Sequence, residues 1–135
     1  MKKIIITGAL GQDGIILSKI MLKKKFKVIG LIRNIKKRKI KKVTYIKINL
    51  LNFSKLCKFL DKIKPDIIVH FGSDNPSYGS NFSSLFYKRN FKIFINLVNY
   101  VVANKKIKLL FSNSSQIFSQ TKKKVNENSK IHIKD

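Results

Sequence analysis

The stretch that decides the fold is KKIIITGALGQDGIILSKIML, residues 2–22. Its isoleucine run predicts a buried strand over residues 3–7, and the apolar rhythm that follows predicts a helix over residues 13–24. Between them lie Gly8, Gly11 and Gly14. In such a turn the first glycine permits a tight bend, the second lets the backbone approach a pyrophosphate, and the third lets helix and strand pack closely. The stretch therefore predicts a dinucleotide site, with a plain glycine-rich turn as the alternative.

The rest of the chain continues to alternate between the two kinds of element. We expect strands over residues 26–32, 43–48, 67–72 and 107–111, a helix over 54–63 capped by Ser54, and a long helix over 82–101. Such alternation predicts right-handed βαβ units and a parallel sheet that is covered on both faces. We expect residues 1–119 to form the N-terminal portion of a doubly wound α/β domain of the Rossmann NAD(P)-binding type, and residues 120–135 a polar loop or tail. The domain is expected to be incomplete and to lack a C-terminal substrate domain.

A net charge of +24 is the strongest feature of the composition, and it raises the possibility of a nucleic-acid or anionic-membrane partner. Only three of the 30 basic residues are arginine, however, and the lysines are scattered beside abundant isoleucine and asparagine, as an AT-rich coding sequence would produce. Nucleic-acid readers usually concentrate arginine and aromatic residues on one face. We therefore favour composition drift over nucleic-acid binding, and we expect the basic block IKKRKIKK, residues 35–42, to be a solvated loop.

The length of 135 residues allows one domain with a hydrophobic core. No apolar run reaches the roughly 18 residues that a membrane span needs, and the N-terminus has no signal-peptide pattern. The single cysteine, Cys57, excludes an internal disulfide and is typical of a reducing compartment. These features predict a cytoplasmic protein without a membrane partner, and no metal site is expected.

The end of the second predicted strand bears on the choice of dinucleotide. NAD-binding domains usually place an acidic residue there to hold the ribose 2′-hydroxyl, whereas a 2′-phosphate favours arginine. In this chain the strand ends in Leu-Ile-Arg-Asn, residues 31–34, with no acidic residue. The pattern favours NADP with Arg33 as the phosphate-binding residue, although Arg33 could also be one more surface cation of a basic protein.

These residues resemble the extended short-chain dehydrogenase/reductase family, and within it the GDP-mannose 4,6-dehydratases and related nucleotide-sugar enzymes. The most specific part is TGALGQDG, residues 7–14, which is similar to the family pattern T-G-x-x-G-Q-D-G. Asn49 stands where the family has an aspartate beside the adenine, and its amide oxygen could still accept a hydrogen bond there. The resemblance implies bound NADP, or NAD as the alternative, with these contacts: Gly8, Gly11, Gln12, Asp13, Gly14, Arg33, Asn49, Leu50, Phe71, Gly72, Ser73 and Tyr87.

The segment LLFSNSSQIFSQ, residues 109–120, resembles the family's fifth-strand motif S-[ST]-S-E-x-Y-G. The resemblance implies that Ser114 is the catalytic serine, whose hydroxyl would hydrogen-bond the sugar 4-oxygen while a hydride moves to the nicotinamide. A serine-rich strand end is the alternative. Gln116 replaces the family's general acid/base glutamate, and the family's Tyr-x-x-x-Lys pair is missing from the 135 residues.

The expected function is therefore the NADP(H)-binding portion of a nucleotide-sugar enzyme similar to GDP-mannose 4,6-dehydratase, as a fragment that is inactive alone. The alternatives are a fragment of an epimerase or reductase, a dinucleotide-binding module without catalysis, and, less favoured, a basic nucleic-acid-binding protein. A nucleotide-sugar substrate is expected only in a full-length relative. An uncovered sheet edge could promote homo-oligomers.

Overall fold

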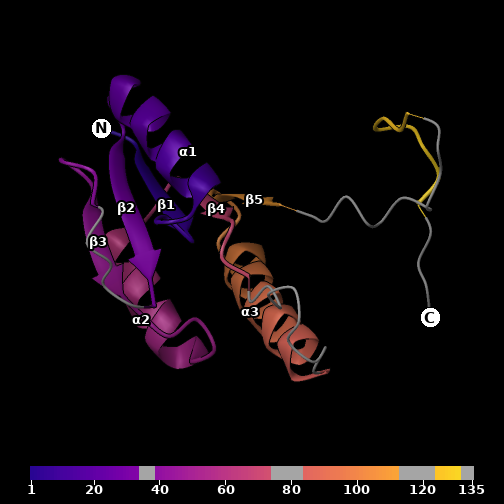
Figure 1. Ribbon diagram of the computed structural model, residues 1–135. Coiled ribbons are helices and arrows are strands. Elements are labelled where there is room, and N and C mark those ends of the chain that lie inside the picture. The colour runs from indigo at the N-terminus through magenta and orange to yellow at the C-terminus, as the bar shows by residue number, and fades with distance from the viewer. Residues whose placement is uncertain (34–38, 74–83, 113–123, 132–135) are drawn as a thin grey trace.

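Strands and helices follow one another along the chain in the order that the sequence predicts, with β2 and β3 as consecutive strands. The computed structural model describes residues 1–33, 39–73, 84–112 and 124–131. Its elements in chain order are β1 (Lys3–Thr7), α1 (Gln12–Lys23), β2 (Lys27–Ile32), β3 (Thr44–Lys47), α2 (Phe53–Ile63), β4 (Ile67–His70), α3 (Ser84–Ala103) and β5 (Lys108–Phe111). The five strands are parallel and form one sheet in the order β3-β2-β1-β4-β5 (Figure 1). This is a Rossmann-like α/β fold.

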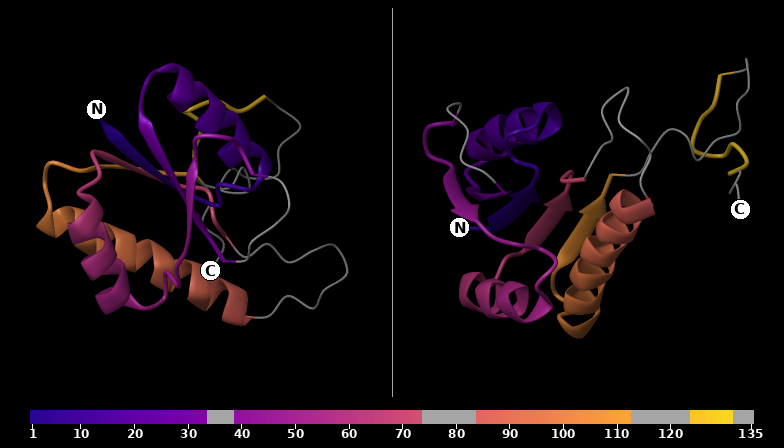
Figure 2. Two further views of the ribbon diagram at one scale, coloured as in Figure 1. Left: turned by 90° about the vertical axis from the view of Figure 1, so that its left-hand side faces the viewer. Right: turned by 60° about the horizontal axis from the view of Figure 1, so that its bottom comes forward.

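Strands β1, β2 and β4 are buried because helices lie on both sides of the sheet (Figure 2), whereas the edge strands β3 and β5 are partly exposed. Successive residues of a strand point to opposite faces, so the isoleucine run of β1 contributes to two separate cores. Ile5 packs with Leu56 of α2 and Leu97 of α3, whereas Ile4 and Ile6 belong to the cluster on the face of α1. The uninterrupted run of apolar residues in β1 is thus what a central parallel strand requires.

Helix α1 approaches the sheet closely because the residues on its buried face are small. Its buried residues are Gly14 and Ser18, and the Ser18 hydroxyl donates to the Gly14 carbonyl over 2.6 Å. A Cβ on Gly14 would stand 2.7 Å from the Ala9 Cα and would also clash with the Gly8 carbonyl oxygen. The close packing expected of the third glycine is therefore present.

The N-cap of α2 is Asn52, and the prediction that Ser54 caps this helix was wrong. Asn52 has extended backbone angles, and its Oδ1 accepts a hydrogen bond from the Lys55 N–H over 3.0 Å. Its own carbonyl accepts from the Leu56 N–H, so the first intrahelical bond already starts at residue 52. Ser54 therefore lies inside the first turn, where its hydroxyl is no longer at the capping position.

Two polar contacts tie α3 to the elements beside it. Asn96, only 2% exposed, donates from its Nδ2 to the carbonyls of Leu50 (2.8 Å) and Leu51 (3.2 Å) in the loop between β3 and α2. One turn later the Tyr100 hydroxyl donates to Asp61 Oδ1 of α2 over 2.8 Å. These bonds fix α3 against the loop at the carboxyl end of β3 and against α2. Within the described ranges, no helix is long and apolar enough to cross a membrane.

Candidate functional site

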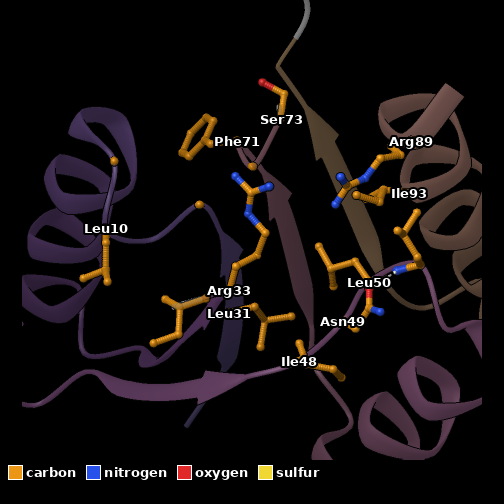
Figure 3. Close-up of a pocket in the computed structure, with 15 residues that line it drawn as sticks. Leu10, Leu31, Arg33, Ile48, Asn49, Leu50, Phe71, Ser73, Arg89 and Ile93 are labelled. Atoms are coloured by element: carbon orange, nitrogen blue, oxygen red, sulfur yellow. Dashed lines mark hydrogen bonds between the residues drawn. The ribbon is translucent and has the colours of Figure 1, made fainter. Parts of the chain in front are cut away.

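A pocket of about 560 Å³ opens at the carboxyl ends of the strands, where the strand order reverses between β1 and β4 (Figure 3). In doubly wound sheets this crevice is the usual position of a ligand. The lining residues come from the β1–α1 turn, the ends of β2, β3 and β4, and the first turns of α3. They are Gly8, Leu10, Gly11, Leu31, Ile32, Arg33, Ile48, Asn49, Leu50, Leu51, Phe71, Gly72, Ser73, Arg89 and Ile93.

The floor of the pocket is the glycine turn that opens α1. Gly8 has a φ of +66°, in the left-handed region that side chains disfavour, and its carbonyl accepts from the Gly11 N–H over 2.9 Å. Gly11 is the N-cap of α1 and lines the pocket, so the N-terminus of the helix, which is the positive end of its dipole, lies at the pocket floor. A phosphate group suits this position because a negative charge is favoured at a helix N-terminus.

A buried network fixes the turn after β4 against the turn after β1. The Gly72 N–H donates to Thr7 Oγ1 over 3.0 Å, and Thr7 Oγ1 lies 2.6 Å from His70 Nδ1. Because the hydroxyl carries one proton, we assign it as the donor to Nδ1, which leaves the imidazole proton on Nε2. Burial lowers the pKa of His70 to about 4, so the ring is neutral near pH 7 and can accept this bond. The ring also stacks on Phe111 of β5, with 5.4 Å between centroids.

The opposite wall is the loop between β3 and α2. Asn49 Oδ1 accepts a hydrogen bond from the Leu51 N–H over 3.0 Å, so this oxygen shapes the loop that lines the pocket. The Asn96 side chain of α3 binds the same loop, because it donates hydrogen bonds to two carbonyls of the loop. An amide oxygen has two lone pairs, so Asn49 Oδ1 can accept a second donor, as the expected contact with an adenine amine requires.

Two arginines supply positive charge to the pocket. Arg33 follows β2 directly, and Arg89 lies half-buried on the first part of α3; Figure 3 shows both side chains reaching into the pocket. None of the described lining residues is acidic. The pocket therefore combines an apolar wall, a helix N-terminus and two guanidinium groups, which is a suitable environment for an anionic ligand with a flat apolar part.

Most of the predicted cofactor contacts that lie in the described ranges come together in this pocket. They are Gly8, Gly11, Arg33, Asn49, Leu50, Phe71, Gly72 and Ser73. Gln12 and Asp13 are exposed in the first turn of α1, Gly14 is buried beneath that turn, and Tyr87 is 62% exposed on α3; these four do not line the pocket. Ser114 and Gln116 lie outside the described residues and stay predictions.

Sequence reasoning missed Thr7, His70, Arg89 and Asn96. Thr7 and His70 did carry a signal, since each is a polar residue near the end of an otherwise apolar strand. Asn96 is the residue that donates to the two loop carbonyls.

Comparison with known proteins places these observations in a family. The family model described as "NAD dependent epimerase/dehydratase family" matches residues 4–134. No match was found among curated proteins. The UDP-Glc/GlcNAc 4-epimerase from the human pathogen Campylobacter jejuni is a similar solved structure, with a TM-score of 0.84 and 22% identity over 98% of this chain and 43% of that one.

Two further solved structures are of similar likeness. The dTDP-glucose 4,6-dehydratase from Bacillus anthracis, in complex with NAD, has a TM-score of 0.79 and 18% identity over 100% of this chain and 45% of that one. The UDP-glucose 4-epimerase from Bifidobacterium longum, in complex with NAD+ and UDP, has a TM-score of 0.79 and 15% identity over 97% and 43%. This chain therefore spans less than half the length of these proteins, and at such identities the likeness shows the fold.

Proposed function

The chain belongs to the NAD dependent epimerase/dehydratase family, in agreement with its resemblance to extended short-chain dehydrogenases/reductases, and from this premise we propose that its pocket binds a nicotinamide dinucleotide. The observation that carries the proposal is the glycine turn at the N-terminus of α1, which lies where the strand order reverses. Related folds that have been solved with NAD support it. The pocket also fits the ligand chemically, because it offers main-chain amides and guanidinium groups to phosphates and an apolar wall to a base.

We propose that the adenosine half of the cofactor lies towards β2 and β3. On that side Arg33 would contact a ribose 2′-phosphate, and Asn49 and Leu50 would flank the adenine. A guanidinium can make two parallel hydrogen bonds to one phosphate, whereas it gains little from a ribose hydroxyl. The preferred cofactor is therefore NADP(H). The remaining members of the proposed contact set are Gln12, Asp13, Gly14 and Tyr87.

The proposed reaction class is the modification of a nucleotide sugar, most similar to GDP-mannose 4,6-dehydration, with epimerisation or reduction as the alternative. The cofactor would supply reversible hydride transfer. Ser114 would hydrogen-bond the sugar 4-oxygen, but Gln116 cannot exchange a proton near neutral pH. None of the four tyrosines is followed by a lysine four residues later. We therefore expect the 135-residue chain to bind cofactor without converting GDP-mannose, and turnover by the purified chain would contradict this part of the proposal.

Titration calorimetry with NADP+ and NAD+ tests the cofactor assignment. We expect the wild-type chain to bind NADP+ roughly tenfold or more tightly than NAD+, since a charged hydrogen bond contributes about 1.5–3 kcal/mol. Arg33→Ala should remove that preference and leave NAD+ affinity nearly unchanged. Lys27→Ala is the matched control, because it removes one exposed charge at the far end of the same strand.

Two outcomes would count against the assignment. If the wild-type chain binds neither dinucleotide, the pocket has another ligand. If NADP+ and NAD+ bind equally to the wild type and to Arg33→Ala, Arg33 is an ordinary surface cation and NAD is the cofactor.

A further inference from the structure

We propose that Arg89 is a second phosphate-binding residue of the pocket and that it contacts the pyrophosphate of the dinucleotide. The inference rests on the proposed function and extends it, because it assigns an anion contact to α3, a helix outside the glycine turn. The observations that carry it are the composition of the pocket wall, the position of Arg89 relative to Arg33, and the charge of the lining.

The composition of the wall is unexpected for this chain. The sequence contains 27 lysines and only three arginines, yet the two cationic side chains among the described lining residues are both arginine. Lysine offers a hydrated point charge, whereas arginine offers a rigid fork that matches two oxygens of one phosphate. A chain that uses lysine almost everywhere else thus presents its rarer, phosphate-matched cation twice in one cavity.

The two arginines reach the pocket from different elements. Arg33 follows β2, whereas Arg89 is carried by α3, which connects β4 to β5 and is bonded through Asn96 to the loop after β3. The turn with Gly8 and Gly11 follows β1, the central strand of the sheet. A dinucleotide that crosses the strand ends would therefore meet Arg33 with its adenosine part. Arg89 would approach it from the side beyond the ribose 2′-position, where the pyrophosphate is the available anion.

The surroundings of Arg89 favour a strong contact. The side chain is half-buried, and Ile93, one turn further along α3, lines the pocket beside it (Figure 3). Asn96 fastens the same helix to the loop that forms the opposite wall, so the position of Arg89 relative to that wall is set by the fold. A guanidinium held beside apolar side chains interacts with an anion in a lower effective dielectric than water, which strengthens the attraction.

The experiment measures the binding of four ligands to the wild type and four variants by titration calorimetry. ADP contains a pyrophosphate without a 2′-phosphate, 2′-AMP contains the reverse, and NAD+ and NADP+ are the complete dinucleotides. We expect Arg89→Leu to lower the affinities for ADP, NAD+ and NADP+ by a common factor of roughly tenfold or more. The affinity for 2′-AMP should stay within about twofold of the wild-type value. Arg33→Ala should instead weaken the binding of 2′-AMP and NADP+ and leave the affinities for ADP and NAD+ within about twofold. Lys92→Leu, which removes an exposed charge three residues further along α3, should change none of the four.

Arg89→Lys keeps the positive charge but not the forked guanidinium, so it should lower the same three affinities by a smaller factor. This variant replaces Arg89→Leu in the experiment if the leucine variant does not fold. Unchanged ADP affinity in an Arg89 variant, or a loss confined to 2′-AMP and NADP+, would overturn the inference while dinucleotide binding by the wild type still supports the proposed function. A wild-type chain that binds neither ADP nor either dinucleotide would overturn both.

Discussion

The buried pair Thr7–His70 predicts a specific loss of stability in mild acid. Protonation of His70 would place a charge in a side chain that is 3% exposed and would remove the Nδ1 lone pair that accepts the Thr7 proton. The folded state therefore resists protonation, and burial lowers the pKa of His70 from its usual 6.5 to about 4. In the unfolded chain the same imidazole takes up its proton below pH 6.5. The unfolded state thus binds more protons between pH 6.5 and 4, and stability falls as the pH is lowered through this window.

The magnitude follows from the two pKa values. The free energy of unfolding should fall by about 2 kcal/mol between pH 8 and pH 5, and by about 3 kcal/mol once the pH is below 4. The maximum slope is about 1.4 kcal/mol per pH unit. This is a large part of the 5–15 kcal/mol that is typical of a small domain.

The assay is urea unfolding followed by far-ultraviolet circular dichroism at pH 8, 6 and 5 and constant ionic strength. His70→Asn is the informative variant, since the amide oxygen can accept the Thr7 proton but cannot titrate. It should be less stable than the wild type at pH 8, because it is smaller than the ring it replaces, and it should lose about 2 kcal/mol less than the wild type between pH 8 and 5. The control is the same substitution at His132, the other histidine of the chain. Equal losses for the wild type and His70→Asn over this range would refute the reasoning.

Three further substitutions test the packing around the pocket. Asn96→Leu should cost about 1–3 kcal/mol in urea unfolding, because two partly buried carbonyls lose their donor; a cost below about 0.5 kcal/mol would mean that water replaces it. Gly14→Ala should lower the melting temperature far more than Gly11→Ala, since the first Cβ would clash with backbone at under 3.0 Å and the second would meet one atom at 3.2 Å; equal shifts would contradict the close packing of α1. Tyr100→Phe should destabilise by about 1 kcal/mol, and a double-mutant cycle with Asp61→Asn should show that the two losses are not additive.

The fold could be predicted because its signals are local in the sequence. The isoleucine run ended by Gly8 defines β1 to the residue, and the ends of the other elements agree to within two residues. The capping residue of α2 was wrong, because both Asn52 and Ser54 have suitable side chains. The choice between them depends on which residue keeps extended backbone angles, and composition does not report that.

Only those residues of the candidate site that belong to a local sequence motif could be predicted. The glycine turn and Arg33 follow directly from the order of residues along β1, α1 and β2. Thr7 and His70 are 63 residues apart and become neighbours through the register of β1 and β4, which pairs them directly. In the sequence Arg89 is one of 30 basic residues, and its place in the pocket depends on how α3 packs against the sheet. Such contacts arise from tertiary packing, so periodicity and spacing alone do not reveal them.

The contact between Gly8 and Gly72 has a consequence for how this gene can change over time. A Cβ on Gly8 would lie 2.8 Å from the Gly72 nitrogen, and a Cβ on Gly72 would lie 3.0 Å from the Gly8 nitrogen. The first distance is a clash and the second is a tight contact, and both are with the backbone of the other glycine, so no second substitution at that position can relieve them. A mutational bias that replaces residues with lysine, isoleucine and asparagine would therefore stop at these two codons for as long as the fold is maintained. In a drifting lineage, this pair should be among the last traces of the ancestral site to disappear.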